Sequence, residues 1–149
     1  MHSIFSTRAI TLILHFQSTQ QTALGDQIVS SDIRVLEFQD FGKEFIVSNK
    51  MSPDSFVQMS MILAYYKLYG QVVCTYEPVL TKAFFHGRTE AMRSATVEAK
   101  HFVEVFCNAS ISPQLKESAL RAATHVHSQL VKECARGQGV DRHLFALKW

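Results

Sequence analysis

A short segment of the chain, "AFFHGRTEAMRSAT" at residues 83–96, concentrates charged and hydroxyl side chains between apolar neighbours. Within six residues it carries Arg88, Thr89, Glu90 and Arg93. A guanidinium group binds a carboxylate or a phosphate through two parallel hydrogen bonds, and a nearby hydroxyl can add another. Because only 19% of the residues are charged, this concentration predicts a loop that binds an anion.

A structural role is the alternative for the two arginines of this loop. Arg88 and Arg93 could pair with Glu90, with Asp54 or with the backbone instead of with a ligand. Side chains of these types serve structure more often than function when each is considered singly. The elements around this loop are therefore needed to distinguish a ligand-binding role from a structural one.

The composition fits one globular domain. The chain has 149 residues, of which 47% are hydrophobic, and this is ample for a single core. Its formal net charge is +2, and its 15 basic residues are scattered rather than gathered into a stripe. Binding of nucleic acid therefore has little support.

The cysteines and histidines show no metal-binding or redox spacing. Cys74, Cys107 and Cys134 are odd in number and lack a CxxC motif, so we expect buried thiols in a reducing compartment. His125 and His127 are two residues apart, which places them on different faces of a helix. No HExxH motif is present, and we assign no metal site.

The N-terminal segment "MHSIFSTRAITLILHFQST" has one arginine, several hydroxyls and no acidic residue before Asp26. That pattern loosely matches a mitochondrial presequence. Its apolar run at residues 9–16 is too short to cross a bilayer, and no transmembrane segment is predicted elsewhere. An ordinary buried strand or helix, or an alternative start, is favoured over a targeting signal.

Two strands are predicted from alternation and composition. Residues 32–42, "DIRVLEFQDFG", alternate apolar and polar side chains. Residues 71–79, "QVVCTYEPV", are rich in β-branched and aromatic types and are expected to end as a strand at Pro78.

Helices are predicted from caps and from helical spacing. Residues 52–70 begin with Ser-Pro-Asp and end with glycine, and their apolar residues all round predict a buried helix. Residues 97–107 and 112–137 are also expected to be helical, and residues 141–149 resemble the first turns of another helix. In the long helix at 112–137 the inward positions are Leu115, Leu120, Ala123 and Leu130.

Six motifs together resemble the choline/carnitine acyltransferase family, and the carnitine acetyltransferase branch is the nearest. They are "FGKEF", "SPDSFVQ", "LAYYKLYGQ", "TYE", "GRTEAMRSAT" and "DRHLFALK". Their order and separations fit from Asp32 to Lys148, about four-fifths of the chain. Residues 1–27 match nothing, so we expect an unmatched segment at 1–27 and a partial acyltransferase domain at 28–149.

The resemblance implies an α/β fold and a transferase. The fold is expected to be part of a coenzyme A-dependent acyltransferase lobe, similar to chloramphenicol acetyltransferase, with a mixed sheet flanked by helices. The family moves an acyl group between coenzyme A and carnitine in fatty acid metabolism. Coenzyme A enters as a thioester substrate, and no further cofactor is implied. Family members occupy mitochondria, peroxisomes and the reticulum, so the compartment and the acyl-chain length stay open.

The catalytic histidine of the family is expected to be missing from this sequence. In the family it stands in an HxxxD motif and acts as general base on the carnitine hydroxyl. No HxxxD occurs here, since His86 begins the different pattern HGRTE. We therefore expect the 149 residues alone to be inactive and to need the rest of an acyltransferase chain. The alternative is a non-catalytic truncated isoform or a binding remnant.

The resemblance also implies a clamp for the carboxylate of carnitine. The matching positions are Tyr76 in TYE, Thr89 in GRTE and Arg142 in DRH. Choline lacks a carboxylate, and Thr89 and Arg142 therefore disfavour a choline acyltransferase. Structural alternatives stay open for two of them: Tyr76 could pack in the core, and Arg142 could cap the preceding helix.

Coenzyme A is expected to contact Lys43, Asp54 and Glu77, which match family positions around its phosphate and along its site. Three departures weaken this half of the resemblance. Val47 replaces a second lysine, Pro78 replaces a small hydroxyl residue, and Ser128 replaces an arginine; Lys50 is the nearby basic residue that could compensate.

Overall fold

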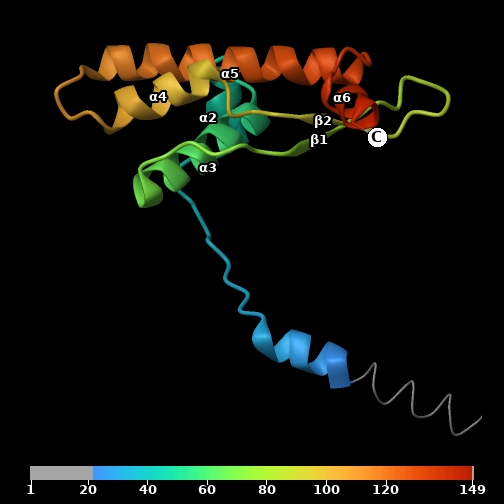
Figure 1. Cartoon of the computed structure of the whole chain (residues 1–149). Coiled ribbons are helices and arrows are strands. Elements are labelled where there is room, and N and C mark those ends of the chain that lie inside the picture. The colour runs from blue at the N-terminus through green and yellow to red at the C-terminus, as the bar shows by residue number, and fades with distance from the viewer. Residues whose placement is uncertain (1–21, 149) are drawn as a thin grey trace, which may run out of the picture. The chain divides into compact units, whose positions relative to one another are not determined.

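The computed structural model describes residues 22–148, and the interpretations of the first 19 residues lie outside this range (Figure 1). The chain divides into two compact units, Met1–Gln39 and Asp40–Trp149. In the described part of the first unit, residues 22–30 are helical and residues 31–39 have no regular structure.

The prediction of a strand at residues 32–42 is wrong. Ile33 and Val35 are 86% and 81% exposed, and no strand forms in this segment. A strand needs a partner for its backbone N–H and C=O groups, and the described residues supply none here. Alternation of side chains alone therefore does not make this segment a strand.

The second unit contains five helices and one hairpin among its described residues. In chain order they are α2 (Lys43–Ser48), α3 (Pro53–Tyr69), β1 (Glu77–Leu80), β2 (Thr89–Met92), α4 (Val97–Cys107), α5 (Pro113–Ala135) and α6 (Asp141–Leu147). Helix α5 is the centre of the unit, because it packs against α3, α4 and both strands (Figure 1). This mixture of helices with a small sheet agrees with an α/β class. The sheet described is a two-stranded antiparallel pair rather than the mixed sheet that was expected.

The helix termini follow the predicted chemistry. Ser52 caps α3 by accepting the N–H of Ser55, and Gly70 ends that helix with a φ of 69°. Ser112 caps α5 in the same way, by accepting the N–H of Leu115. Helices α4, α5 and α6 therefore confirm the helical segments expected after residue 96.

The prediction that α3 is buried on all sides is wrong. Its buried residues are Ser55, Met59 and Ile62, whereas Met61 is 59% exposed and Leu68 is 75% exposed. In α5, Ala123 is buried as predicted, but Leu115 is 61% exposed. Apolar periodicity identifies the helix, but only neighbouring elements decide which of its faces are covered.

The core forms two clusters. The larger joins α3, α4 and α5 through Met59, Ile62, Ala99, Phe102, Val103, Ala119 and Ala123. The smaller joins the hairpin to α5 through Val79, Met92 and Cys134. Cys134 is thus the buried thiol that was expected, whereas Cys74 and Cys107 are exposed, contrary to expectation.

The hairpin is shifted from its predicted position. Strand β1 begins at Glu77 rather than at residue 71, runs through Pro78 and pairs with β2, which lies inside the segment expected to be a loop. The eight residues 81–88 connect the strands, and a side chain at Gly87 would collide with the carbonyl oxygen of Thr81. Glycine at this position therefore permits the close turn.

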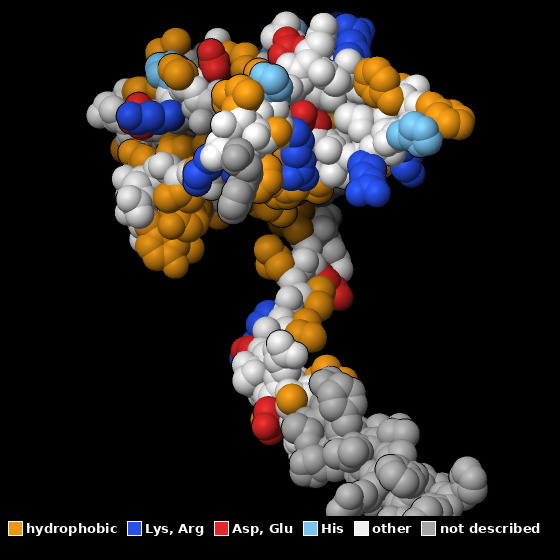
Figure 2. All heavy atoms as spheres, turned by 45° about the vertical axis from the view of Figure 1, so that its right-hand side comes forward, with side chains coloured by type: hydrophobic (Ala, Val, Ile, Leu, Met, Phe, Trp, Pro, Cys, Tyr) orange, Lys and Arg blue, Asp and Glu red, His pale blue; other side chains and the backbone are white. Residues whose placement is uncertain are grey.

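Large apolar side chains remain exposed on several elements, and Figure 2 shows hydrophobic groups over much of the face in view. No helix in the described range combines the length and apolar character that crossing a bilayer requires.

Candidate functional site

Tyr76 and Arg142 meet although 66 residues separate them. The Nη2 atom of Arg142, on α6, donates to the hydroxyl oxygen of Tyr76 at 3.0 Å. Tyr76 precedes β1 and is 52% exposed, so it is not packed in the core. One donor of the guanidinium is used in this bond, and the remaining N–H groups can meet an anion from solvent.

Two residues of the charged segment fix the start of α6. Arg93 donates from Nε to Oδ1 of Asp141 at 2.8 Å, and its guanidinium lies 5.6 Å from the centre of the Tyr76 ring. Glu90 is 8% exposed, and its Oε1 accepts the backbone N–H of Arg142 at 3.2 Å. The hydrogen bond from Arg93 lowers the pKa of Asp141. These contacts hold the backbone of α6 where Arg142 reaches Tyr76.

A structural role for Arg93 is therefore present. Arg93 bonds a backbone group, the carbonyl oxygen of Thr75 at 3.2 Å, and its side-chain partner is Asp141, which was not expected, rather than Glu90 or Asp54. Glu90 instead serves the backbone of its own strand and of α6. The sequence alone could not predict this pairing, because Asp141 lies 48 residues beyond Arg93.

Thr89 is not brought to the Tyr76–Arg142 pair. It opens β2 and pairs with Leu80, whereas Glu77, next to Tyr76, pairs with Met92 at the other end of the ladder. Leu80, the partner of Thr89, lies four positions after Tyr76, which is about 13 Å along an extended chain.

Two of the three residues expected at the coenzyme A site share a cleft with Tyr76. This cleft has a volume of about 650 Å³ and is lined by Asp54 and Glu77 together with Tyr76, Gln58, Met61 and Pro78. Lys43 stands at the first position of α2 and does not line this cleft. The structure therefore places one residue of the expected clamp beside two residues of the expected coenzyme A site.

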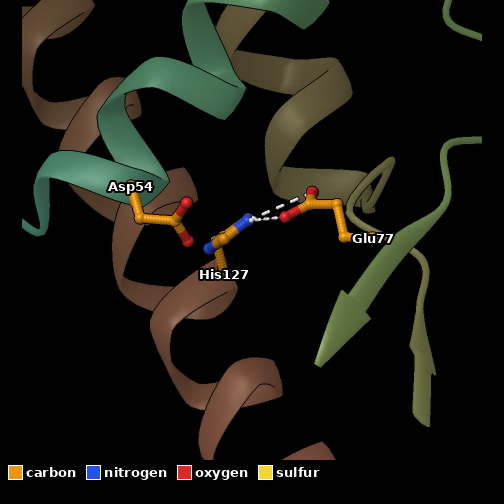
Figure 3. Close-up of side chains that lie close together, drawn as sticks. All are labelled: Asp54, Glu77 and His127. Carbon is orange, nitrogen blue, oxygen red and sulfur yellow. Dashed lines mark hydrogen bonds and ion pairs between the residues drawn. The ribbon is translucent and has the colours of Figure 1, made fainter. Parts of the chain in front are cut away.

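His127 orders the wall of this cleft. Its Nε2 lies 3.0 Å from Glu77 Oε2, and its Nδ1 lies 2.9 Å from Ser55 Oγ (Figure 3). Burial raises the pKa of Glu77, but the hydrogen bonds from His127 and Ser94 and the attraction of His127 outweigh burial, so the pKa is lowered. Glu77 is thus held as a carboxylate at the edge of the cleft.

The order Ser55–His127–Glu77 has the connectivity of a hydrolase triad, but Ser55 is only 1% exposed. A substrate cannot reach a nucleophile buried to that degree. The three residues instead form a hydrogen-bonded chain that joins α3, α5 and β1. Sequence spacing did not single out His127, because its partners lie on α3 and β1. The sequence did indicate, from their spacing on a helix, that His125 and His127 face different sides, and the structure confirms this.

Asp54, Glu77 and His127 are also the group of described residues that could hold a metal ion (Figure 3). Each offers one ligand atom, and these atoms lie within 4.8 Å of one another. A cation bound at Nε2 of His127 would have to displace its two hydrogen bonds to Glu77, which measure 3.0 and 3.2 Å. The contacts therefore support a hydrogen-bonded wall rather than a metal centre.

Comparison with known proteins decides the family. Residues 13–149 match the sequence profile described as Choline/Carnitine o-acyltransferase. The chain belongs to this family. The match begins ahead of residue 28, within the segment for which the motifs gave no resemblance.

The relatives of this chain include several carnitine enzymes. The chain is 41% identical over 125 residues to carnitine O-acetyltransferase of Homo sapiens, which is 84% of the chain and 20% of the relative. It is 38% identical over 120 residues to peroxisomal carnitine O-octanoyltransferase of Homo sapiens, 79% of the chain and 20% of the relative. Carnitine O-acetyltransferase of Columba livia is 40% identical over 117 residues, 78% of the chain and 19% of the relative. The chain thus spans about a fifth of the length of these relatives.

Proposed function

We propose that this chain is part of a carnitine O-acyltransferase that transfers an acyl group between coenzyme A and carnitine. In this proposal Arg142 and Tyr76 hold the carnitine carboxylate, and Asp54 and Glu77 line the coenzyme A site. The observation that carries it is the hydrogen bond between Arg142 and Tyr76, at the edge of the cleft that both carboxylates line. Membership of the family and the names of the relatives support the reaction class.

The chemistry of the pair fits a carboxylate. A guanidinium is always charged and presents parallel donors that match the two oxygens of a carboxylate. The phenol of Tyr76 accepts from Arg142, so its own O–H is free to donate to the same ligand. Thr89 is the third residue of the clamp and rests on the family pattern, and its place at the far end of the ladder predicts a smaller effect. Lys43 is likewise proposed on the family pattern, as a contact to a coenzyme A phosphate.

The remainder of the reaction is expected from other parts of an acyltransferase. Carnitine must lose a hydroxyl proton to a general base, and no HxxxD motif occurs in these residues. We infer that the 149 residues alone do not catalyse acyl transfer. A non-catalytic binding remnant is the second candidate, favoured by that missing motif.

The test uses a chimeric enzyme, in which residues 32–148 replace the matching segment of the Homo sapiens carnitine O-acetyltransferase. Arg142→Asn is expected to raise the carnitine KM about ten- to hundredfold, because a hydrogen bond to a charged group contributes about 1.5–3 kcal/mol. The coenzyme A KM should stay unchanged, and the preference for carnitine over choline should narrow. Steady-state kinetics with both substrates measure this.

Arg136→Asn is the matched control, since Arg136 is an exposed arginine at the end of α5 that does not line the cleft. It should leave both KM values unchanged. An Arg142→Asn enzyme that melts at a lower temperature but keeps its carnitine KM would show that Arg142 is structural, and the clamp would be rejected.

A further inference from the structure

Tyr76 lies in a segment that has no regular structure of its own. Residues 72–76 form neither helix nor strand, and the pairing of β1 starts only at Glu77. Tyr76 is also 52% exposed, so packing covers only about half of it. The position of its hydroxyl therefore depends on how the residues before and after it are held.

Thr75, on one side of Tyr76, is bound to the chain that follows β2. Its Oγ1 accepts the backbone N–H groups of Ser94 at 2.9 Å and of Ala95 at 3.0 Å, and it lies 2.7 Å from Oγ of Ser94. Because Oγ1 accepts from both N–H groups, its own proton is available for the Ser94 hydroxyl. The carbonyl oxygen of Thr75 accepts from Nη1 of Arg93 at 3.2 Å. Thr75 is thus tied to three consecutive residues, 93–95.

Glu77, on the other side of Tyr76, is bound to α5. Both of its carboxylate oxygens lie within 3.2 Å of Nε2 of His127, which is 1% exposed. A carboxylate only accepts hydrogen bonds, so Nε2 is the nitrogen that carries the proton. In the neutral ring Nδ1 then accepts from Oγ of Ser55 at 2.9 Å. The imidazole is therefore held at both nitrogens, and it holds Glu77.

The two anchors meet at Ser94. This residue is 1% exposed, and its side chain hydrogen-bonds Glu77 as well as Thr75. No buried side-chain nitrogen or oxygen among the described residues lacks a partner, so the polar chain is fully satisfied. A satisfied buried network is rigid. Thr75 and Glu77 are thus tied to each other through Ser94, and Tyr76 is the residue that lies between them.

We propose that Thr75 and His127 are positioning residues, which hold the Tyr76 hydroxyl where it can bind a carboxylate together with Arg142. The inference rests on the proposed function for the identity of that ligand. Both residues act through Tyr76 rather than on the ligand, Thr75 directly and His127 by way of Glu77. A hydroxyl that is held in place in advance loses less freedom when the ligand binds, and this improves affinity.

Two variants of Thr75 in the chimeric enzyme test the first anchor. Thr75→Val keeps the shape of the side chain but removes Oγ1, and it should raise the carnitine KM about three- to tenfold. The kcat and the coenzyme A KM should change little. Thr75→Ser keeps the hydroxyl and should restore the parent KM. Thr124→Val is the matched control, because Thr124 is a buried threonine on α5 that bonds the carbonyl oxygen of Leu120 and does not line the cleft beside Tyr76. It should leave the carnitine KM unchanged.

A double variant shows whether Thr75 acts through Tyr76. Tyr76→Phe removes the hydroxyl and should raise the carnitine KM about tenfold. Adding Thr75→Val to Tyr76→Phe should then change the KM little, because the group that Thr75 places is already gone. A purely structural role for Thr75 would instead make the two effects multiply, and multiplied effects would overturn the proposal.

Two variants of His127 test the second anchor. The amide nitrogen of His127→Gln can take the place of Nε2 as a donor to Glu77, whereas the shorter side chain of His127→Asn does not reach it. His127→Asn should raise the carnitine KM about three- to tenfold, and His127→Gln should restore most of it. If Thr75→Val does not give a folded enzyme, this pair makes the same comparison. Equal carnitine KM values in His127→Asn and the parent would overturn the role of His127.

Fluorine NMR separates a failure of this inference from a failure of the proposed function. With 3-fluorotyrosine at position 76 of the chimeric enzyme, the resonance should shift or broaden in Thr75→Val and in His127→Asn, and should return in Thr75→Ser and in His127→Gln. A resonance that responds to none of the variants would overturn the anchoring, whatever Tyr76 binds. If the resonance responds but Tyr76→Phe leaves the carnitine KM unchanged, the anchoring of Tyr76 stands and its part in the proposed clamp is rejected.

Discussion

Glu90 connects two elements through a single oxygen. Its Oε1 accepts the backbone N–H of Ala91 at 2.8 Å and that of Arg142 at 3.2 Å. The first N–H groups of a helix have no partner within the helix, and Val140 provides no side-chain cap at the start of α6. Glu90 therefore satisfies a helix terminus and, by doing so, sets the place from which the Arg142 side chain extends.

Replacement of Glu90 should disturb carnitine recognition through Arg142. In the chimeric enzyme, Glu90→Ala removes both hydrogen bonds and is expected to raise the carnitine KM about tenfold, with little change in the coenzyme A KM. Glu90→Gln keeps an oxygen acceptor of the same reach and should restore most of the affinity. Kinetics of the two variants decide the matter: equal KM values in Glu90→Ala and the parent would show that α6 holds its place without Glu90.

Sequence reasoning at this scale found side chains but few partners. The motif order led to Tyr76 and Arg142, which the structure joins by a hydrogen bond. It did not lead to His127 or Asp141, because contacts at separations of 50 and 48 residues leave no local pattern. Residue type and spacing report on neighbours along one helix or strand, whereas these two pairs depend on how separate elements pack.

Helices α3, α4 and α5 were predicted well because their signals are local, whereas α2 and the helix at residues 22–30 were not predicted. Ser-Pro starts, a terminal glycine and helical spacing lie within each segment, and α3, α4 and α5 begin and end within two residues of their expected bounds. The strands were predicted less well, because a strand forms only where a neighbouring strand pairs with its backbone. Residues 71–76 have β-forming composition but no partner strand, and pairing starts only where Glu77 faces Met92.

The packing of α4 on α3 and α5 allows a matched comparison within one helix. Phe102 is 2% exposed inside the main cluster, whereas its ring neighbour Phe106, with centroids 5.6 Å apart, is 36% exposed. Phe102→Ala should lower the free energy of unfolding by about 3–5 kcal/mol. Phe106→Ala should cost about 1–2 kcal/mol, since less apolar area is lost. Urea unfolding of the chimeric enzyme measures both, and equal costs would contradict the assignment of this core.

On the scale of the whole molecule, the most informative feature is apolar surface. Val57, Met61 and Leu68 on α3, and Leu144 and Phe145 on α6, are all at least 45% exposed. The two strands form a sheet with both outer edges open among the described residues. Exposed side chains and open edges are features that further strands and helices of a larger lobe would cover. This agrees with a chain that spans about a fifth of its relatives.

The isolated 149-residue chain is therefore expected to be loosely packed or to aggregate, and to transfer no acyl group. Loss of a general base alone lowers a rate about 10²–10⁴-fold, and a substrate held on fewer sides loses further rate through poor positioning. A thiol-release assay with acetyl-coenzyme A and carnitine should stay at background, while light scattering and a broad thermal transition report the packing. The chimeric enzyme is the control, because it carries residues 32–148 within a complete active site and should turn over. Turnover by the isolated chain near the rate of the chimeric enzyme would mean that these residues contain their own base, and a sharp transition of a soluble monomer would mean that the exposed apolar faces need no cover.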